Sequence, residues 1–165
     1  TGVTIIKIDE EVDHGPILFQ EEEAIKLENT SEILLLRLFQ KAANSLPKTI
    51  SEYAKTTLTL TDQIHSEATF TKSLSRKDGY IDISKLKLEN SLEIRNWQLE
   101  IARRIRALYP WPGVWTKYKL GSKELVVKFL PQQKLQVEGK KPVSYKDFIN
   151  GYENGEEFFR KLYLI

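Results

Sequence analysis

The opening segment has the hydrophobic pattern of two short strands joined by a turn. The run VTIIKI (3–8) is β-branched and largely apolar, which predicts a strand buried on both faces. An acidic stretch and the Gly15-Pro16 turn follow, and ILFQ (17–20) predicts a second short strand.

A strongly apolar segment comes next, and its pattern predicts helices. Asn29 lies three residues before Glu32, a spacing similar to the capping box that begins a helix. Pro47 suits the first turn of a further helix over 47–54. Strand, turn, strand and helix favour part of an α/β domain with too few strands to close a core by itself. The apolar positions of the first helix are Ile33, Leu34, Leu35, Leu36, Leu38 and Phe39.

A change of pattern separates this segment from the rest of the chain. Residues 56–75 are rich in Thr and Ser and contain no Gly or Pro, which predicts an extended linker. A second unit begins near Arg76, where DGYIDIS (78–84) predicts a turn and a short strand. A helix follows from Ser91, its expected N-cap, to the stop at Tyr109-Pro110. Its apolar face is Ile94, Trp97, Ile101, Ile105 and Leu108.

The C-terminal part then changes to short alternating runs typical of β-strands. These runs are VWTKYKL (114–120), ELVVKFL (124–130), KLQVEG (134–139) and PVSYKDF (142–148). Their spacing of about ten residues favours a small antiparallel barrel or sandwich. The tail GEEFFRKLYLI (155–165) is compatible with a helix or a strand.

Composition narrows the class of protein. The chain has 165 residues, 41% hydrophobic and 29% charged, and contains no cysteine, which excludes disulfides, thiol catalysis and cysteine-bound metal. Its two histidines are isolated, so no metal site is expected. We expect a cytoplasmic protein, because no apolar run reaches the roughly 18 residues of a membrane helix and no signal-peptide pattern is present. The chain begins at Thr1 and lacks Met, so we expect a piece of a longer protein.

The charge is unevenly distributed. Residues 1–69 carry a net charge of −6 and residues 70–165 a net charge of +8. This asymmetry favours two units, the second able to attract a polyanion, although a solvated Lys-rich surface would account for it too. The candidate phosphate contacts are Arg95, Arg103, Arg104, Arg106, Lys117, Lys119, Lys123 and Lys128.

Asp13 is the main candidate for chemistry. It follows a buried-looking strand and precedes a Gly-Pro turn, and active sites of α/β sheets gather at such strand ends. Packing against apolar residues would raise the pKa of its carboxyl toward a useful value. Alternatively, Asp13 hydrogen-bonds the backbone of the turn. His14 has no Ser or Cys nucleophile pattern nearby, so a triad is not expected. Trp111 and Trp115 could stack on bases, but core packing explains them as well.

Two stretches resemble a known family. TGVTIIKIDEEVDHGPIL (1–18) resembles the T-G-V-T-[IV]-x-x-[MIV]-x-x-x-x-D-x-G-x-[IM] segment of folate-dependent formyltransferases. RKDGYIDI (76–83) and EIARRIRALYPWPGVWT (100–116) are similar to the start of the C-terminal domain of the methionyl-tRNA formyltransferases. The purine-pathway relative, glycinamide ribonucleotide formyltransferase, shares the first motif but lacks this second domain.

The resemblance implies a fold of class α/β plus β. Residues 1–55 would be the C-terminal part of a doubly wound, Rossmann-like formyltransferase domain, 56–75 a linker, and 76–165 an OB-like antiparallel β-barrel. The family moves a formyl group from 10-formyltetrahydrofolate to the methionine of initiator methionyl-tRNA, an early step of translation initiation. The resemblance further implies a monomer with no metal and no membrane partner.

The resemblance also implies site residues. Asp13 matches the family's catalytic Asp, and its loop would place Val12, His14 and Gly15 near the folate pterin. Arg95, Arg103, Arg106, Lys117 and Lys119 would bind the tRNA backbone. The family's Asn-x-His and Ser-Leu-Leu-Pro motifs do not occur in this sequence, so we expect this chain alone to be inactive. Two alternatives stay open: a formyltransferase for another amine such as an amino-sugar nucleotide, and a non-catalytic tRNA- or RNA-binding module.

Overall fold

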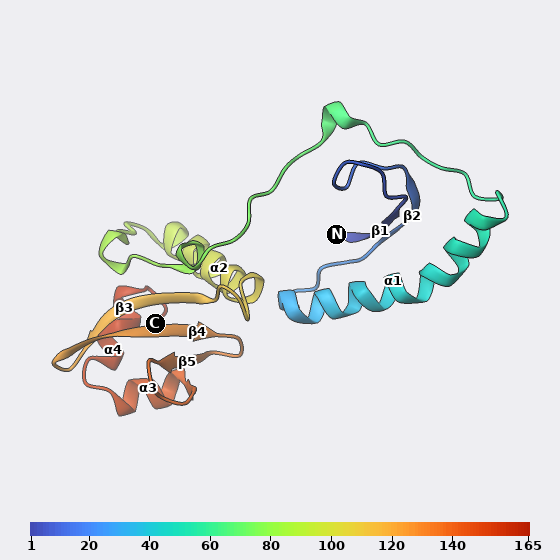
Figure 1. Cartoon of the computed structure of the whole chain (residues 1–165). Helices are drawn as coiled ribbons and strands as arrows, with labels where there is room; N and C mark the ends of the chain where they lie inside the picture. Colours follow the sequence, from blue (N-terminus) through green and yellow to red (C-terminus); the bar gives the residue numbers. More distant parts are fainter. The chain divides into compact units, whose positions relative to one another are not determined.

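The computed structural model describes all 165 residues, Thr1–Ile165. They form two compact units, Thr1–Lys72 and Ser73–Ile165, and Figure 1 labels most of their helices and strands. None of the helices combines the length and apolar character that crossing a membrane requires.

The first unit is a hairpin packed against one long helix. Strands β1 (Gly2–Ile6) and β2 (Ile17–Glu22) pair antiparallel, with an irregularity in register between Ile5 and Ile6. Helix α1 (Ser31–Ala54) lies against this hairpin (Figure 1). Only Val3 is buried in β1, so the predicted burial on both faces is wrong for these residues. A single helix can cover only one face of a two-stranded sheet, so the other face of each strand stays exposed.

Helix α1 is longer than the pattern predicted. It runs without a break through Pro47, where a second helix was expected to begin. A proline keeps a helical φ and removes only its own N–H bond, so the helix continues at a local cost. The N-cap is Thr30, whose hydroxyl accepts a hydrogen bond from Ile33 N at 3.3 Å, rather than Asn29.

The two sides of α1 differ in their surroundings. Thr49 is the one buried residue of the helix. An apolar stripe at helical spacing lies exposed elsewhere on the helix, and it consists of Leu36, Phe39, Leu46, Ile50 and Tyr53. Each of these five residues is at least 40% exposed.

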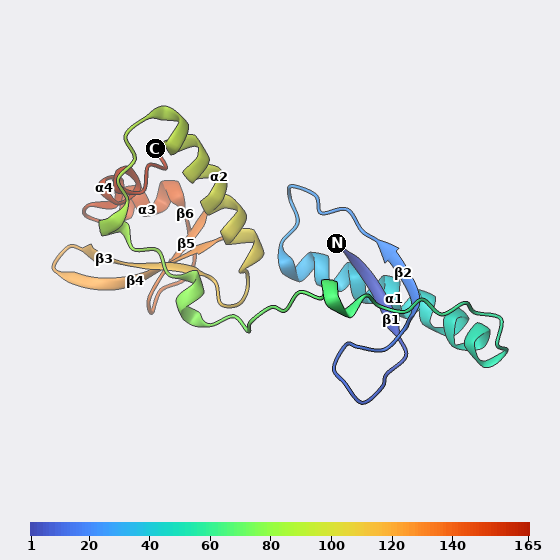
Figure 2. The ribbon, with the colours of Figure 1, turned by 90° about the horizontal axis from the view of Figure 1, so that it is seen from above.

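The second unit is a four-stranded antiparallel sheet with helices on one face (Figure 2). Its strands β3 (Val114–Leu120), β4 (Lys123–Leu130), β5 (Lys134–Val137) and β6 (Val143–Ser144) lie in that order. Helices α2 (Ser91–Ala107), α3 (Tyr145–Gly151) and α4 (Gly155–Lys161) supply the other side of the core. Short 3₁₀ turns occur in this unit at Arg76–Gly79 and Ile83–Lys85, and in the first unit at His65–Glu67.

Alternation along β3 fixes which face of this sheet is buried. Val114, Thr116, Tyr118 and Leu120 are buried, and the residues between them point to the other face. The buried face meets Ile101 and Ile105 of α2, as their helical spacing predicted. The cluster is completed by aromatic rings that pack on one another, namely Phe129, Phe148, Phe158 and Phe159.

Several expectations for the second unit need correction. The open strand order does not show the predicted barrel, because β6 has only two residues and the chain turns at once into α3. Tyr80 forms a single bridge to Trp115 instead of a strand. The N-cap of α2 is Asn90, whose side chain accepts from Glu93 N, and not Ser91. The tail adopts a helix, α4.

Candidate functional site

The loop that joins β1 to β2 carries the predicted catalytic residue. Asp13 is exposed at the turn of this loop, with a φ of 56°. The loop is closed at its base by a hydrogen bond from Lys7 N to Pro16 O at 2.9 Å. Apolar packing around the Asp13 carboxyl, which the sequence predicted, is therefore not formed by the 165 residues.

Gly15 is required by the backbone of the same loop. A Cβ at this position would lie 1.8 Å from the Lys7 carbonyl oxygen. No side chain fits without moving the end of β1, so the close approach of two chain segments explains this glycine. Val12, at the tip of the loop, is 92% exposed and available for contact.

His14 forms an ion pair with an acid of its own loop. Its Nδ1–H donates to Asp9 Oδ2 at 2.8 Å, since a carboxylate can only accept. This hydrogen bond raises the pKa of His14 above its usual 6.5 and lowers the pKa of Asp9 below its usual 3.8. The His14 ring also stacks on His65, with ring centroids 3.7 Å apart.

Residues 61–65, which lie within the expected linker, pack against this loop. Ile17 and Thr61 exchange backbone hydrogen bonds of 2.8 and 3.1 Å. The Gln63 side chain donates to two loop carbonyls, Asp13 O at 2.8 Å and Gly15 O at 2.7 Å. Sequence reasoning missed Gln63, because no local spacing links it to the loop.

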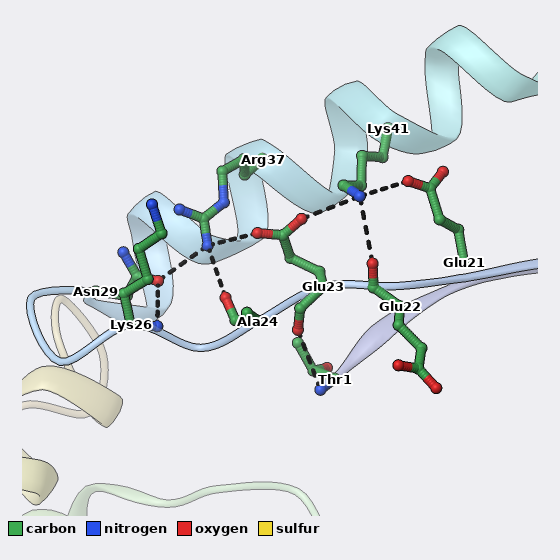
Figure 3. A network of polar contacts seen from close by, with 9 residues as sticks. All are labelled: Thr1, Glu21, Glu22, Glu23, Ala24, Lys26, Asn29, Arg37 and Lys41. Atoms are coloured by element: carbon green, nitrogen blue, oxygen red, sulfur yellow. Dashed lines mark hydrogen bonds and ion pairs between the residues drawn. The ribbon is translucent and has the colours of Figure 1, made fainter.

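A polar network connects the end of β2 to α1 (Figure 3). Glu23 lies between two cations of the helix, 2.9 Å from Arg37 Nη2 and 3.1 Å from Lys41 Nζ. The hydrogen bond from Lys41, aided by the charge of Arg37, lowers the pKa of Glu23. Arg37 also donates to Asn29 Oδ1 at 2.9 Å. These contacts hold the helix beside the hairpin that carries the Asp13 loop.

The outer face of the second unit's sheet is basic and partly aromatic. Lys117 and Lys119 are exposed on β3, on the side opposite the core. Trp115 lies on the same face, where its Nε1 donates to Arg76 O at 3.0 Å and the Arg76 guanidinium lies 5.2 Å from the ring centre. Lys128 is paired with Trp115 on the neighbouring strand.

A cavity of about 660 Å³ borders this face. Lys117 and Lys119 line it together with Arg160 and Lys161 of α4. The last two cations were missed by the sequence analysis, since the secondary structure of the tail was undecided. They are partly balanced, because Arg160 pairs with Glu156 at 2.6 Å and Lys161 with Glu157 at 2.8 Å.

The predicted arginines lie elsewhere in the second unit. Arg95 and Arg103 are exposed on α2, the helix that covers the inner face of the sheet. Arg106 is partly buried and donates to Ala102 O of its own helix at 3.1 Å. The structure thus groups Lys117 with Lys119, and no described cavity joins the arginines to them.

The chain is similar in sequence to known formyltransferases. The family model described as formyl transferase matches residues 1–50. A methionyl-tRNA formyltransferase of Koribacter versatilis is 32% identical over 92% of this chain and 54% of its own length. The enzyme of Roseiflexus castenholzii is 39% identical over 72% of this chain and 34% of its own.

Solved structures share the fold. A 4-N formyltransferase from Francisella tularensis matches with a TM-score of 0.52 at 20% identity, over 77% of this chain and 49% of the other. An uncharacterised Mycobacterium tuberculosis protein, suggested to be a sugar N-formyltransferase, gives 0.53 at 20% identity, over 84% of this chain and 54% of the other.

The chain belongs to the formyltransferase family. Within that family it is a homologue of the methionyl-tRNA formyltransferases, which confirms the resemblance drawn from the two motifs. It spans 54% of the length of the Koribacter versatilis enzyme and 34% of the length of the Roseiflexus castenholzii enzyme.

Proposed function

We propose that the protein containing this chain transfers a formyl group from 10-formyltetrahydrofolate to the amino group of methionine on initiator tRNA. The observation that carries this proposal is 32% identity to a methionyl-tRNA formyltransferase over 92% of the chain, which includes both units. An amino-sugar nucleotide is the second candidate acceptor, favoured by the fold shared with a suggested sugar N-formyltransferase.

The role of Asp13 follows from the chemistry of acyl transfer. The amine nitrogen attacks the formyl carbon, a tetrahedral oxyanion forms, and the bond from that carbon to folate N10 breaks. A proton leaves the amine and one reaches N10, so a carboxylate that relays protons assists both steps. Asp13 would do this together with the family's Asn and His, which would stabilise the oxyanion.

The same loop would face the folate. Val12, His14 and Gly15 adjoin Asp13, and the exposed tip of the loop leaves Val12 free to pack against a flat ring. Asp13 is exposed on the first unit, residues 1–72. A catalytic carboxylate needs this exposure if it is to contact groups that do not belong to this unit.

The basic second unit would bind the acceptor tRNA, which is a polyanion. Lys117 and Lys119 lie on one exposed face with Trp115, and Arg95 and Arg103 are exposed on α2. Arg106 donates to its own helix and would have to exchange that contact to reach a phosphate. A monomer suffices for this arrangement.

The test is an acceptor assay with the full-length protein and 10-formyltetrahydrofolate. Methionyl initiator tRNA should be formylated, and an amino-sugar nucleotide should not. The reverse preference would overturn the proposal in favour of the second candidate, and activity on neither would favour a binding module. Residues 1–165 alone should show no transfer, and activity of this chain would show that the Asn-x-His motif is dispensable.

Asp13→Asn in the full-length enzyme tests the role of the loop. Loss of a general acid or base should lower kcat by about 10²–10⁴-fold. Glu10→Gln removes a charge from the same exposed loop and serves as the control. Unchanged turnover in Asp13→Asn would leave Asp13 a turn residue.

A further inference from the structure

We propose that Gln63 is a positioning residue that holds the Asp13 loop in its working conformation. The inference deepens the proposed function and rests on it, because it gives Gln63 a role only through Asp13. Gln63 lies 50 residues further along the chain, in the segment that the sequence predicts to be a linker.

The geometry of the contact matches what a primary amide can supply. Gln63 Nε2 donates to Asp13 O at 2.8 Å and to Gly15 O at 2.7 Å. The amide nitrogen carries two hydrogens, so both bonds form at once. One side chain therefore spans the turn and fixes the carbonyls on both sides of His14.

The loop needs such a fixing contact. Asp13 has a φ of 56°, a left-handed conformation that costs energy for a residue with a Cβ. Its carboxylate is exposed and takes part in none of the described hydrogen bonds or ion pairs. The direction of the carboxylate is therefore set by the backbone, and Gln63 holds that backbone.

The segment around Gln63 is itself anchored to the loop. Thr61 is bridged to Ile17, the first residue of β2, by two backbone hydrogen bonds. His65 stacks on His14 with an interplanar angle of 9°. Residues 61–65 thus contact the loop and the start of β2 at three points, with Gln63 in the middle, and a freely extended linker would make none of these contacts.

The first measurement uses the 165-residue chain and does not depend on catalysis. Gln63→Met keeps the length of the side chain and removes both donors. Hydrogen exchange of the loop amides should become about 10-fold faster or more, the loss expected for one to two net hydrogen bonds. Gln20→Met is the matched control, because Gln20 donates to Thr4 within the hairpin, away from the loop. Equal exchange in the two variants would overturn the positioning role.

The second measurement uses the full-length enzyme. Gln63→Met should lower kcat by about 10-fold with an unchanged KM for tRNA, because it disturbs only the loop. In the Asp13→Asn background the same substitution should cost almost nothing further, since the two residues act as a unit. Gln63→Glu, which places a carboxylate beside two carbonyls, should be at least as damaging. Additive losses would show that Gln63 acts otherwise than through Asp13 and would overturn the proposal.

Failure of this inference can be told apart from failure of the proposed function. If Asp13→Asn leaves turnover unchanged, the catalytic role fails, whatever the exchange rates show. If Asp13→Asn is damaging while Gln63→Met is not, only the positioning role fails. Circular dichroism and the Tm of each variant check that unit one is still folded.

Discussion

At the residue scale, the pair of His14 and Asp9 gives the loop a defined dependence on pH. The raised pKa of His14 means that its stabilising contribution is complete below its usual 6.5 and is lost as the pH rises through the raised value. The lowered pKa of Asp9 means that its contribution is complete above its usual 3.8 and is lost as the pH falls through the lowered value. The ion pair is therefore fully formed between these two limits, with Glu11 and the His65 ring as its neighbours.

This pair makes a prediction that can be checked by NMR. The Cε1–H resonance of His14 should titrate above the usual pKa of 6.5, because the hydrogen bond to Asp9 favours the charged ring. Asp9→Asn should return the pKa toward the usual value. Asp62→Asn, an exposed acid of the same unit outside this ion pair, should leave the pKa of His14 unchanged. A midpoint that does not respond to Asp9→Asn would contradict the assignment.

Some residues of this site could be predicted from the sequence and others could not. Asp13 lies within a motif whose spacing is local, so the resemblance located it. Gln63 and His65 meet the loop across about 50 residues, and local spacing carries no information about such contacts. The exposure of Asp13 was also not predictable, because it depends on what packs beside the loop.

At the scale of elements, helix α1 is attached to β2 largely through charged groups. Glu23 forms ion pairs with Arg37 and Lys41, and only 13% of its side-chain surface is exposed. Five apolar residues of the helix lie on its exposed stripe instead. The ion pairs therefore set the position of the helix along the hairpin within this unit.

Glu23→Gln should lower the free energy of unfolding at neutral pH, because two cations lose their shared carboxylate. The pKa of Glu23 is lowered, so its contribution is present above its usual 4.5 and disappears as the pH falls through the lowered value. The difference between variant and parent should thus shrink in acid, as measured by urea unfolding at both pH values. Glu22→Gln is the control, since Lys41 contacts only the backbone of Glu22 (Figure 3). A difference that is equal at both pH values would contradict this account.

Element types were predictable where periodicity was long and regular. The spacing in α2 located its buried face at Ile101 and Ile105, and the alternating runs predicted the strands β3, β4 and β5. Ends and joins were harder to predict, because Pro47 can either start or continue a helix and a cap depends on one hydrogen bond. The strand predicted over PVSYKDF (142–148) was wrong for the same reason, since Ser144 caps α3 after only two strand residues.

At the scale of the whole molecule, charge separates the two parts of the chain. Residues 1–69 carry a net charge of −6 and residues 70–165 one of +8. The sequence showed this asymmetry, and the structure adds that Lys117 and Lys119 share one exposed face with an aromatic side chain. Closure of the sheet was not predictable, because strand spacing is the same in an open sheet and in a barrel.

This distribution predicts how the 165-residue chain binds tRNA. Affinity should fall steeply as salt rises, by about 0.7–0.9 logarithmic units of affinity per logarithmic unit of salt for each phosphate contact. Replacing both Lys117 and Lys119 with Gln should weaken binding. It should also reduce the slope of log affinity against log salt by the contribution of up to two phosphate contacts. The matched control replaces Lys48 and Lys55 of the first unit, which removes the same charge from the acidic part of the chain. Equal slopes for the two double variants would place the polyanion somewhere other than the outer face of this sheet, and the arginines of α2 would then be the next group to replace.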